Sequence, residues 1–192
     1  MIHHRPNFHI LTGGPGAGKT TVLEALRACG HLCVDEAARA ILKEQAAIGG
    51  NATHDGDEVR YRDLTLERSI AAFEAVSERS APVFFDRGIP ELRDYAVPEG
   101  AQTPPHVAAA IRGYRYAQMV FIFPPWREIY RHDEERKHTF AHAEWVFDVC
   151  AAVYRACGYD LVEVPRGPVE DRAAFILAHV ENVRPDLPPG KG

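Results

Sequence analysis

The sequence predicts an α/β fold in three layers, with a parallel five-stranded sheet flanked by helices. Five short apolar runs alternate along the chain with longer segments of helical pattern. Such alternation produces right-handed crossover connections, and therefore a parallel sheet covered on both faces. A glycine-rich loop joins the first run to the first helical segment. The 192 residues, 46% hydrophobic and 26% charged, can bury the core of one domain, so we expect a single domain over residues 1–192.

The five predicted strands are short apolar runs bounded by turn residues. Gly30 fits the end of the helix that precedes the second run, and Pro82 precedes the third. Pro124 and Pro165 end the fourth and fifth runs, because proline cannot continue a central strand. The predicted strands are Phe8–Leu11, His31–Val34, Val83–Phe85, Met119–Phe123 and Leu161–Val164.

The predicted helices fill the intervals between these strands. The first carries an apolar stripe at Val22, Leu23 and Leu26, and Pro168 fits the first position of the last. The tail from residue 185 is rich in Pro and Gly and is expected to fray. The helices are expected near 20–28, 36–47, 57–79, 104–116, 126–157 with a break allowed, and 168–183.

Residues 13–20 read GGPGAGKT, a complete G-x-x-x-x-G-K-[ST] phosphate-binding loop. Its glycines let successive backbone N–H groups turn toward a phosphate, and the following helix directs its positive end at the same anion. Lys19 can reach the β- and γ-phosphates of ATP, and the Thr20 hydroxyl can bind Mg²⁺. The predicted nucleotide contacts are Gly13, Gly14, Pro15, Gly16, Ala17, Gly18, Lys19, Thr20 and Thr21.

Charged residues follow the second and third predicted strands, at the sheet edge where ligands bind in such folds. Asp86 can hold Mg²⁺ beside the phosphate loop, and Arg87 can grip a phosphate or a substrate oxygen. Either Asp35 or Glu36 can accept the proton of a hydroxyl acceptor. The alternatives are structural: Asp86 and Arg87 close a surface turn, while Asp35 caps the next helix and Glu36 favours its positive end.

The segment from 126 to 140 is rich in charged residues and predicts a lid over the cleft. Arg131 and Arg136 are its candidate catalytic residues, and Lys137 is a further candidate for contact with the transferring phosphoryl group. A solvated helix face with Glu–Arg and Glu–Lys pairs is the alternative. The turn that includes Arg166 is either a contact for the adenine ring or a simple strand-to-helix turn.

Composition and charge limit the classes of binding partner that we expect for the protein. A net charge of −5 argues against a general nucleic-acid or membrane-surface binder, so we expect neither as a partner. No signal peptide and no apolar stretch of membrane-spanning length is found, and a cytoplasmic location is expected. The four cysteines form no C-x-x-C pair, as expected for thiols in a reducing compartment. A homodimer is compatible with the sequence.

These motifs together resemble the P-loop kinase group, over most of the chain. More narrowly, the sequence resembles small predicted ATPases labelled AAA domain, which are related to ribosylnicotinamide kinase-like and to thymidylate or deoxynucleoside kinase-like proteins. The resemblance implies the strand order 2-3-1-4-5. It also implies that Asp86 faces Mg²⁺ and Arg87 the acceptor phosphate, as in thymidylate kinase-like proteins. Glu36 and Arg39 match the acidic residue and arginine of ribosylnicotinamide kinase-like proteins.

Two departures limit the resemblance. Arg87 stands where motor ATPases carry the Glu that activates water, and no Asn-Lys-x-Asp sequence is present to read guanine. A mechanical ATPase and a GTPase are therefore disfavoured. No motif in the sequence specifies ATP over GTP.

The sequence thus predicts an enzyme that uses ATP and Mg²⁺ to phosphorylate a hydroxyl or phosphate of a nucleoside-like or other small metabolite. The alternative is a nucleotide-binding switch, or a slow NTPase, that acts through a protein partner. A kinase requires an acceptor pocket between the 35–39 turn, the 86–95 region and the lid, whereas a switch requires a partner surface instead. The identity of the acceptor is not readable from the sequence.

Overall fold

The computed structural model of the chain describes residues 2–93, 103–130 and 139–182. A five-stranded parallel sheet forms its centre, in the order β3-β4-β2-β6-β7. Counted along the chain, this is the predicted order 2-3-1-4-5. The strands of this sheet are β2 (Phe8–Gly13), β3 (Leu32–Val34), β4 (Val83–Asp86), β6 (Met119–Phe123) and β7 (Asp160–Glu163).

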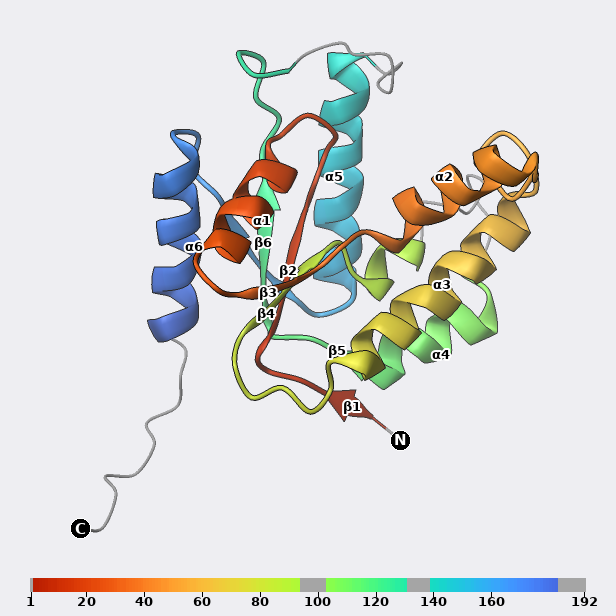
Figure 1. Cartoon of the computed structure of the whole chain (residues 1–192), viewed down its shortest axis with the longest axis horizontal. Helices are drawn as coiled ribbons and strands as arrows, with labels where there is room; N and C mark the ends of the chain where they lie inside the picture. Colours follow the sequence, from red (N-terminus) through yellow and green to blue (C-terminus); the bar gives the residue numbers. More distant parts are fainter. Residues whose placement is uncertain (1, 94–102, 131–138, 183–192) are drawn as a thin grey trace.

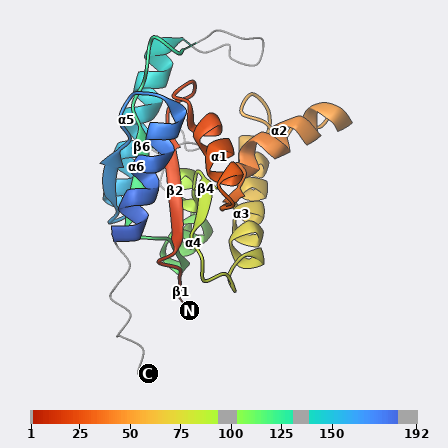
Figure 2. The ribbon, with the colours of Figure 1, turned by 60° about the vertical axis from the view of Figure 1, so that its left-hand side comes forward.

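Helices cover both faces of the sheet, which makes the three layers visible in Figures 1 and 2. One face is covered by α1 and α6, and the other by α3, α4 and α5, while α2 lies against α3. The helices are α1 (Lys19–Ala28), α2 (Ala37–Ile48), α3 (Glu58–Ala75), α4 (Pro105–Gly113), α5 (Phe140–Ala156) and α6 (Val169–Asn182), with a 3₁₀ turn, η1 (Ile89–Arg93).

The side-chain alternation of the central strand β2 separates the two cores. Phe8 and Ile10 pack with α3, α4 and the buried Tyr154 of α5. Leu11, which points the other way, packs with α1 and α6. Because the strands are parallel, their carboxyl ends meet at one edge of the sheet, and the phosphate-binding loop follows β2 at that edge.

Three predicted helix boundaries are wrong. The helix expected at 104–116 ends at Gly113, because Tyr114–Arg115 form a short strand, β5, that pairs with β1 (His3–His4). The helix expected at 57–79 ends at Ala75. Of the segment expected at 126–157, residues 126–130 are not helical, and α5 begins at Phe140, where the Thr139 side chain caps it by accepting from the His142 N–H at 3.3 Å.

Candidate active site

The phosphate-binding loop adopts a backbone conformation that only its glycines permit. Gly16 has a φ of 74° and Gly18 a φ of 81°, values that residues with a β-carbon rarely adopt. Gly18 is the N-cap of α1, so the helix begins at Lys19. The positive end of the helix therefore faces the loop, where an anion is favoured.

Lys19 is buried, and the loop itself holds its ammonium group. Nζ donates to the carbonyl oxygens of Gly13, at 3.1 Å, and Gly14, at 3.2 Å. Burial lowers the pKa of Lys19, and the nearby charge of Arg87 lowers it further. Neutral carbonyls offset only part of the lost hydration, so a phosphate would be a stronger partner for this ammonium.

A cavity of about 500 Å³ lies over this loop, and we call it the phosphate-loop cavity. The segment after β6 contributes Trp126 and Ile129 to its wall, and the turn after β7 contributes Gly167 and Pro168. The predicted lid therefore begins at the cavity. Arg131, Arg136 and Lys137 lie outside the described residues.

Three predicted nucleotide contacts occupy different positions around this cavity. Thr20 and Thr21 are exposed on the first turn of α1 and line it. Thr21 Oγ1 donates to the Gly18 carbonyl at 2.8 Å. Arg166 is not part of the described lining, and its guanidinium donates to the Pro125 carbonyl at 2.8 Å, so it ties together the turns that follow β6 and β7.

Arg172 lines the same cavity and was missed in the sequence. It is 2% exposed, donates to the Ala17 carbonyl at 2.8 Å, and lies over the rings of Phe123 and Trp126. Its Nε has no hydrogen-bond partner in the part of the chain that the structure describes, and burial lowers the pKa of its guanidinium. The one available signal was an arginine on the apolar stripe of a predicted helix, beside Ala173 and Ile176.

Asp86 has the environment of a cation ligand. Its Oδ1 is buried without a hydrogen-bond partner among the described residues, and burial raises the pKa of the carboxyl group. A bound cation would compensate the ionised form. The described residues contain no cluster of three or more His, Cys, Asp or Glu side chains at a metal-binding distance. A P-loop Mg²⁺ site needs no such cluster, because phosphate and water oxygens supply the other ligands.

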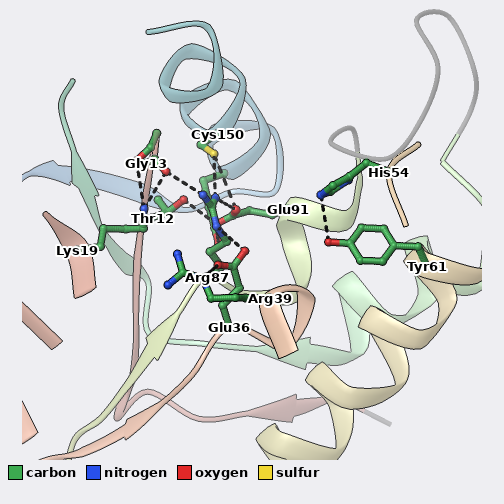
Figure 3. Close-up of polar contacts among 12 residues, drawn as sticks. Thr12, Gly13, Lys19, Glu36, Arg39, His54, Tyr61, Arg87, Glu91 and Cys150 are labelled. Carbon is green, nitrogen blue, oxygen red and sulfur yellow. Dashed lines mark hydrogen bonds and ion pairs between the residues drawn. The ribbon is translucent and has the colours of Figure 1, made fainter. Parts of the chain in front are cut away.

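Arg87 stands at the centre of the polar contacts in Figure 3. Its Nε lies 3.0 Å from Glu36 Oε1, its Nη1 pairs with Glu91, and its Nη2 donates to the Gly13 carbonyl at 3.1 Å. Its φ is 67°, in the left-handed region that a residue with a β-carbon occupies at a cost of about 1–2 kcal/mol. A strained backbone therefore carries a guanidinium fixed between two carboxylates.

Glu91 is the second residue that sequence reasoning missed. It is 6% exposed and accepts hydrogen bonds from Thr12 Oγ1, at 2.6 Å, and from the Tyr154 hydroxyl, at 2.8 Å, besides pairing with Arg87 (Figure 3). Cys150 Sγ lies 3.9 Å from its Oε2. Glu91 thus joins β2, η1 and α5 behind the arginine. Its i, i+4 spacing from Arg87 was the only signal in the sequence.

The two candidate bases point in different directions. The Asp35 side chain is 82% exposed and pairs with Arg27 of α1, and it does not cap α2, whose N-cap is Glu36. The Glu36 side chain is 20% exposed and lies between Arg87 and Arg39, whose Nε is 4.0 Å from Glu36 Oε2. Glu36 also lines the phosphate-loop cavity together with Asp86 and Lys19, so the structure brings these predicted residues to one cavity.

A second and larger cavity, of about 730 Å³, lies between α2, α3 and η1, and we call it the α2–α3 cavity. Phe85, Leu92 and Tyr116 give it an apolar wall. It shares five lining residues with the phosphate-loop cavity: Pro15, Glu36, Arg39, Asp86 and Arg87. The two cavities therefore meet where the predicted catalytic residues gather. The described part of the 86–95 region contributes to this cavity, as predicted for an acceptor pocket.

A phosphate loop that opens α1, at the carboxyl edge of a parallel sheet ordered 2-3-1-4-5, defines a P-loop domain of kinase-like fold. A family model described as "AAA domain" matches residues 8–172. The chain therefore belongs to this AAA domain family, as its sequence motifs suggested.

Two solved structures resemble this one. Thymidylate kinase from Ehrlichia chaffeensis is 12% identical, with a TM-score of 0.58, over 94% of this chain and 100% of that one. Shikimate kinase from Acinetobacter baumannii, in complex with shikimate, is 17% identical, with a TM-score of 0.49, over 94% of this chain and 95% of that one. At these identities the likeness concerns the fold alone. A search of curated proteins finds no match.

No helix within the described residues combines the length and the apolar character needed to cross a membrane.

Proposed function

We propose that the protein is an ATP- and Mg²⁺-dependent phosphotransferase, which moves the γ-phosphoryl group of ATP to a hydroxyl or phosphate of a small nucleoside-like or other metabolite. The observation that carries the proposal is the junction of the two cavities at Glu36, Asp86 and Arg87. One cavity is lined by Pro15–Thr21 of the phosphate loop and the start of α1, and the other by Pro15 alone of these residues, so each has room for a different reactant. A switch protein has no use for the second cavity, which favours the kinase.

In this proposal the loop amides and Lys19 hold the phosphates of ATP. Lys19 exchanges the Gly13 and Gly14 carbonyls for phosphate oxygens, which carry full negative charge. Trp126 and Pro168, which line the outer part of the phosphate-loop cavity, offer surfaces for the base. The proposal also keeps the role that the sequence predicts for Arg131 and Arg136, which is to contact the transferring phosphoryl group from the lid.

The unpaired Oδ1 of Asp86 and the exposed hydroxyl of Thr20 are the groups that would hold Mg²⁺. When bound, the ion neutralises charge on the β- and γ-phosphates.

Glu36 is the proposed proton acceptor for a hydroxyl substrate, and Asp35, which is exposed and paired with Arg27, is the weaker candidate. The acceptor oxygen forms a bond to the γ-phosphorus while the bond to the β,γ-bridging oxygen breaks. The proton passes to Glu36, and ADP leaves with the bridging oxygen. Arg87, held from behind by Glu91, contributes positive charge at the junction of the cavities.

The test is ADP release from Mg²⁺-ATP, alone and with separate pools of nucleosides, nucleotides and other small hydroxylated metabolites. Stimulation by one pool is expected, followed by detection of the phosphorylated product on splitting that pool. Lys19→Ala serves as the inactive reference. Slow ADP release that no pool changes, or full activity of Lys19→Ala, would overturn the proposal.

A further inference from the structure

The α2–α3 cavity has an uneven distribution of charge between its two ends. At the end shared with the phosphate-loop cavity, Glu36 and Asp86 stand beside Arg39 and Arg87. Beyond this shared end, four charged residues line it: Asp35, Lys43, Arg62 and Glu91. The remote part of the cavity therefore contains two carboxylates and two cations, and their pairing decides which charge a ligand meets.

Both of these carboxylates are already occupied. The Asp35 side chain is 82% exposed and pairs with Arg27, which lies on α1. Glu91 is buried and accepts hydrogen bonds from Thr12, Tyr154 and Arg87. Each carboxylate therefore already has a cationic partner within the protein, Arg27 for Asp35 and Arg87 for Glu91.

The two cations are compensated much less. Arg62, on α3, is 8% exposed, and its Nε and Nη2 both donate to one oxygen of Asp63, at 3.0 and 2.8 Å. That same oxygen lies 3.0 Å from His106 Nε2. Within the described part of the chain, Arg62 Nη1 has no partner, and Lys43, on α2, has neither an ion pair nor a hydrogen bond. Arg62 therefore shares one oxygen of Asp63 with His106 and keeps Nη1 available to a ligand, and the Lys43 ammonium is available as well.

The position of Lys43 sets a length scale for that ligand. Glu36 is the N-cap of α2, and Lys43 lies seven residues further along, which corresponds to about 10 Å along a helix axis. Between these ends the wall is apolar, with Phe85, Leu92 and Tyr116. The cavity thus offers a carboxylate at one end, a less polar middle and cations at the other end.

We infer that the acceptor of the proposed reaction is an anion: a small molecule whose phosphate or carboxylate lies against Arg62 and Lys43, while the group to be phosphorylated lies against Glu36. This inference rests on the proposed function for the role of the cavity, but the anion site itself can be measured without turnover. Arg62 and Lys43 are, in this view, specificity-determining residues, since a neutral analogue leaves both cations unmatched.

The test measures the binding of inorganic phosphate, and separately of acetate, to the full chain saturated with Mg²⁺ and a non-hydrolysable ATP analogue. The analogue fills the phosphate loop, so a second anion must bind elsewhere. Calorimetry should detect one further site with a dissociation constant in the millimolar range. Tighter binding of phosphate indicates a phosphorylated acceptor, and tighter binding of acetate a carboxylated one.

Three variants locate that site. Arg62→Gln should weaken anion binding about tenfold, and Lys43→Gln about threefold to tenfold, with unchanged affinity for the nucleotide analogue. Arg60→Gln removes an exposed arginine of α3 that does not line the cavity, and it should change nothing. Because Lys43 is exposed and has no partner among the described residues, its variant is expected to fold even if Arg62→Gln does not.

Absence of anion binding by the loaded protein, or binding that Lys43→Gln and Arg62→Gln leave unchanged, would overturn the inference. The failure of the proposed function is separate. Efficient phosphorylation of a neutral acceptor without an anion site removes only the inference, whereas a confirmed anion site in a protein that phosphorylates no acceptor, anionic or neutral, removes the proposed function.

Discussion

The two cavities that meet at Glu36, Asp86 and Arg87 are built in different ways. The phosphate-loop cavity is lined by seven consecutive residues, Pro15–Thr21, whose backbone conformation is set by glycines and by the start of α1. The α2–α3 cavity is assembled from residues far apart in the chain: the ends of β3 and β4 with the turns that follow them, the helices α2 and α3, the 3₁₀ turn η1, and Tyr116 before β6. The difference shows that the first cavity is a local property of the chain, whereas the second is a property of the fold.

Lys19→Ala tests whether the two cavities can be separated, and it has the largest expected effect. Loss of the loop ammonium should lower kcat/KM for ATP about a hundredfold to a thousandfold, while phosphate binding in the α2–α3 cavity stays within about twofold. Steady-state kinetics and calorimetry measure the two sides independently. Arg155→Ala, an exposed substitution on α5, is the matched control and should leave both values unchanged.

Glu36→Gln tests the junction of the cavities. If Glu36 accepts the proton, kcat should fall about a hundredfold with little change in the affinity for nucleotide. Asp35→Asn is the matched control, because its carboxylate is exposed and pairs with Arg27 instead, and it should retain most activity. The reverse ranking of the two variants would assign the base to Asp35. A phosphate acceptor would leave both variants active, since it needs no base.

Acid pH tests the stability of the central sheet, which supports both cavities. His9, on the central strand β2, is 3% exposed between Phe84 and Phe121, and burial lowers its pKa from 6.5 to about 4. Between these pH values the unfolded chain binds more protons than the folded one. The contribution of His9 to the free energy of unfolding is therefore present above pH 6.5 and is lost as the pH falls toward 4. We expect the free energy of unfolding to decrease by about 2 kcal/mol between pH 6.5 and 5 from this group alone.

Denaturant unfolding at pH 7 and pH 5 measures this loss, and His9→Leu should remove most of it. Asp86 acts with the opposite sign, because its raised pKa makes the folded state hold a proton more firmly as the pH falls. An equal acid sensitivity in His9→Leu and in the unsubstituted protein would therefore trace the loss to other groups.

Glu91→Gln has the smallest expected effect on activity. It tests a residue that pairs with Arg87 but does not line the phosphate-loop cavity. Loss of its charge should lower kcat about tenfold, with an unchanged KM for ATP, since the guanidinium is then held less firmly. Tyr154→Phe removes one hydrogen bond to Glu91. It should cost about 1 kcal/mol of stability but preserve kcat. A parallel loss of stability and kcat in both variants would reduce Glu91 to a structural role.

The sequence predicted the fold well because its signals are periodic and local. Apolar runs and helical stripes placed the strands of the central sheet, and the loop at 13–20 placed the phosphate site. The errors fall where tertiary contacts override such signals. Residues 114–115 leave the helical pattern to pair with β1, and residues 126–130, which composition made helical, follow β6 without forming a helix. No local pattern distinguishes these cases from a continuing helix.

The site was predicted in part for the same reason. Residues that directly follow a strand, such as Glu36, Asp86 and Arg87, can be placed at the sheet edge from the strand order alone. Glu91 and Arg172 cannot, because each acquires its role from partners far along the chain: Tyr154 for Glu91 and Ala17 for Arg172. Asp35 and Glu36 are adjacent in sequence, and only the structure shows that they face different partners.

One peptide oxygen, the carbonyl of Gly13, links the binding of ligands in the two cavities. The Gly13 carbonyl accepts from Lys19 and from Arg87, each at 3.1 Å. A nucleotide that draws Lys19 away leaves this oxygen to Arg87, which belongs to both cavities. The free energies of binding in the two cavities are then coupled. Thermodynamic reciprocity requires that nucleotide changes the affinity for the acceptor by the same factor as the acceptor changes the affinity for nucleotide. A thermodynamic cycle of four dissociation constants would measure that factor directly.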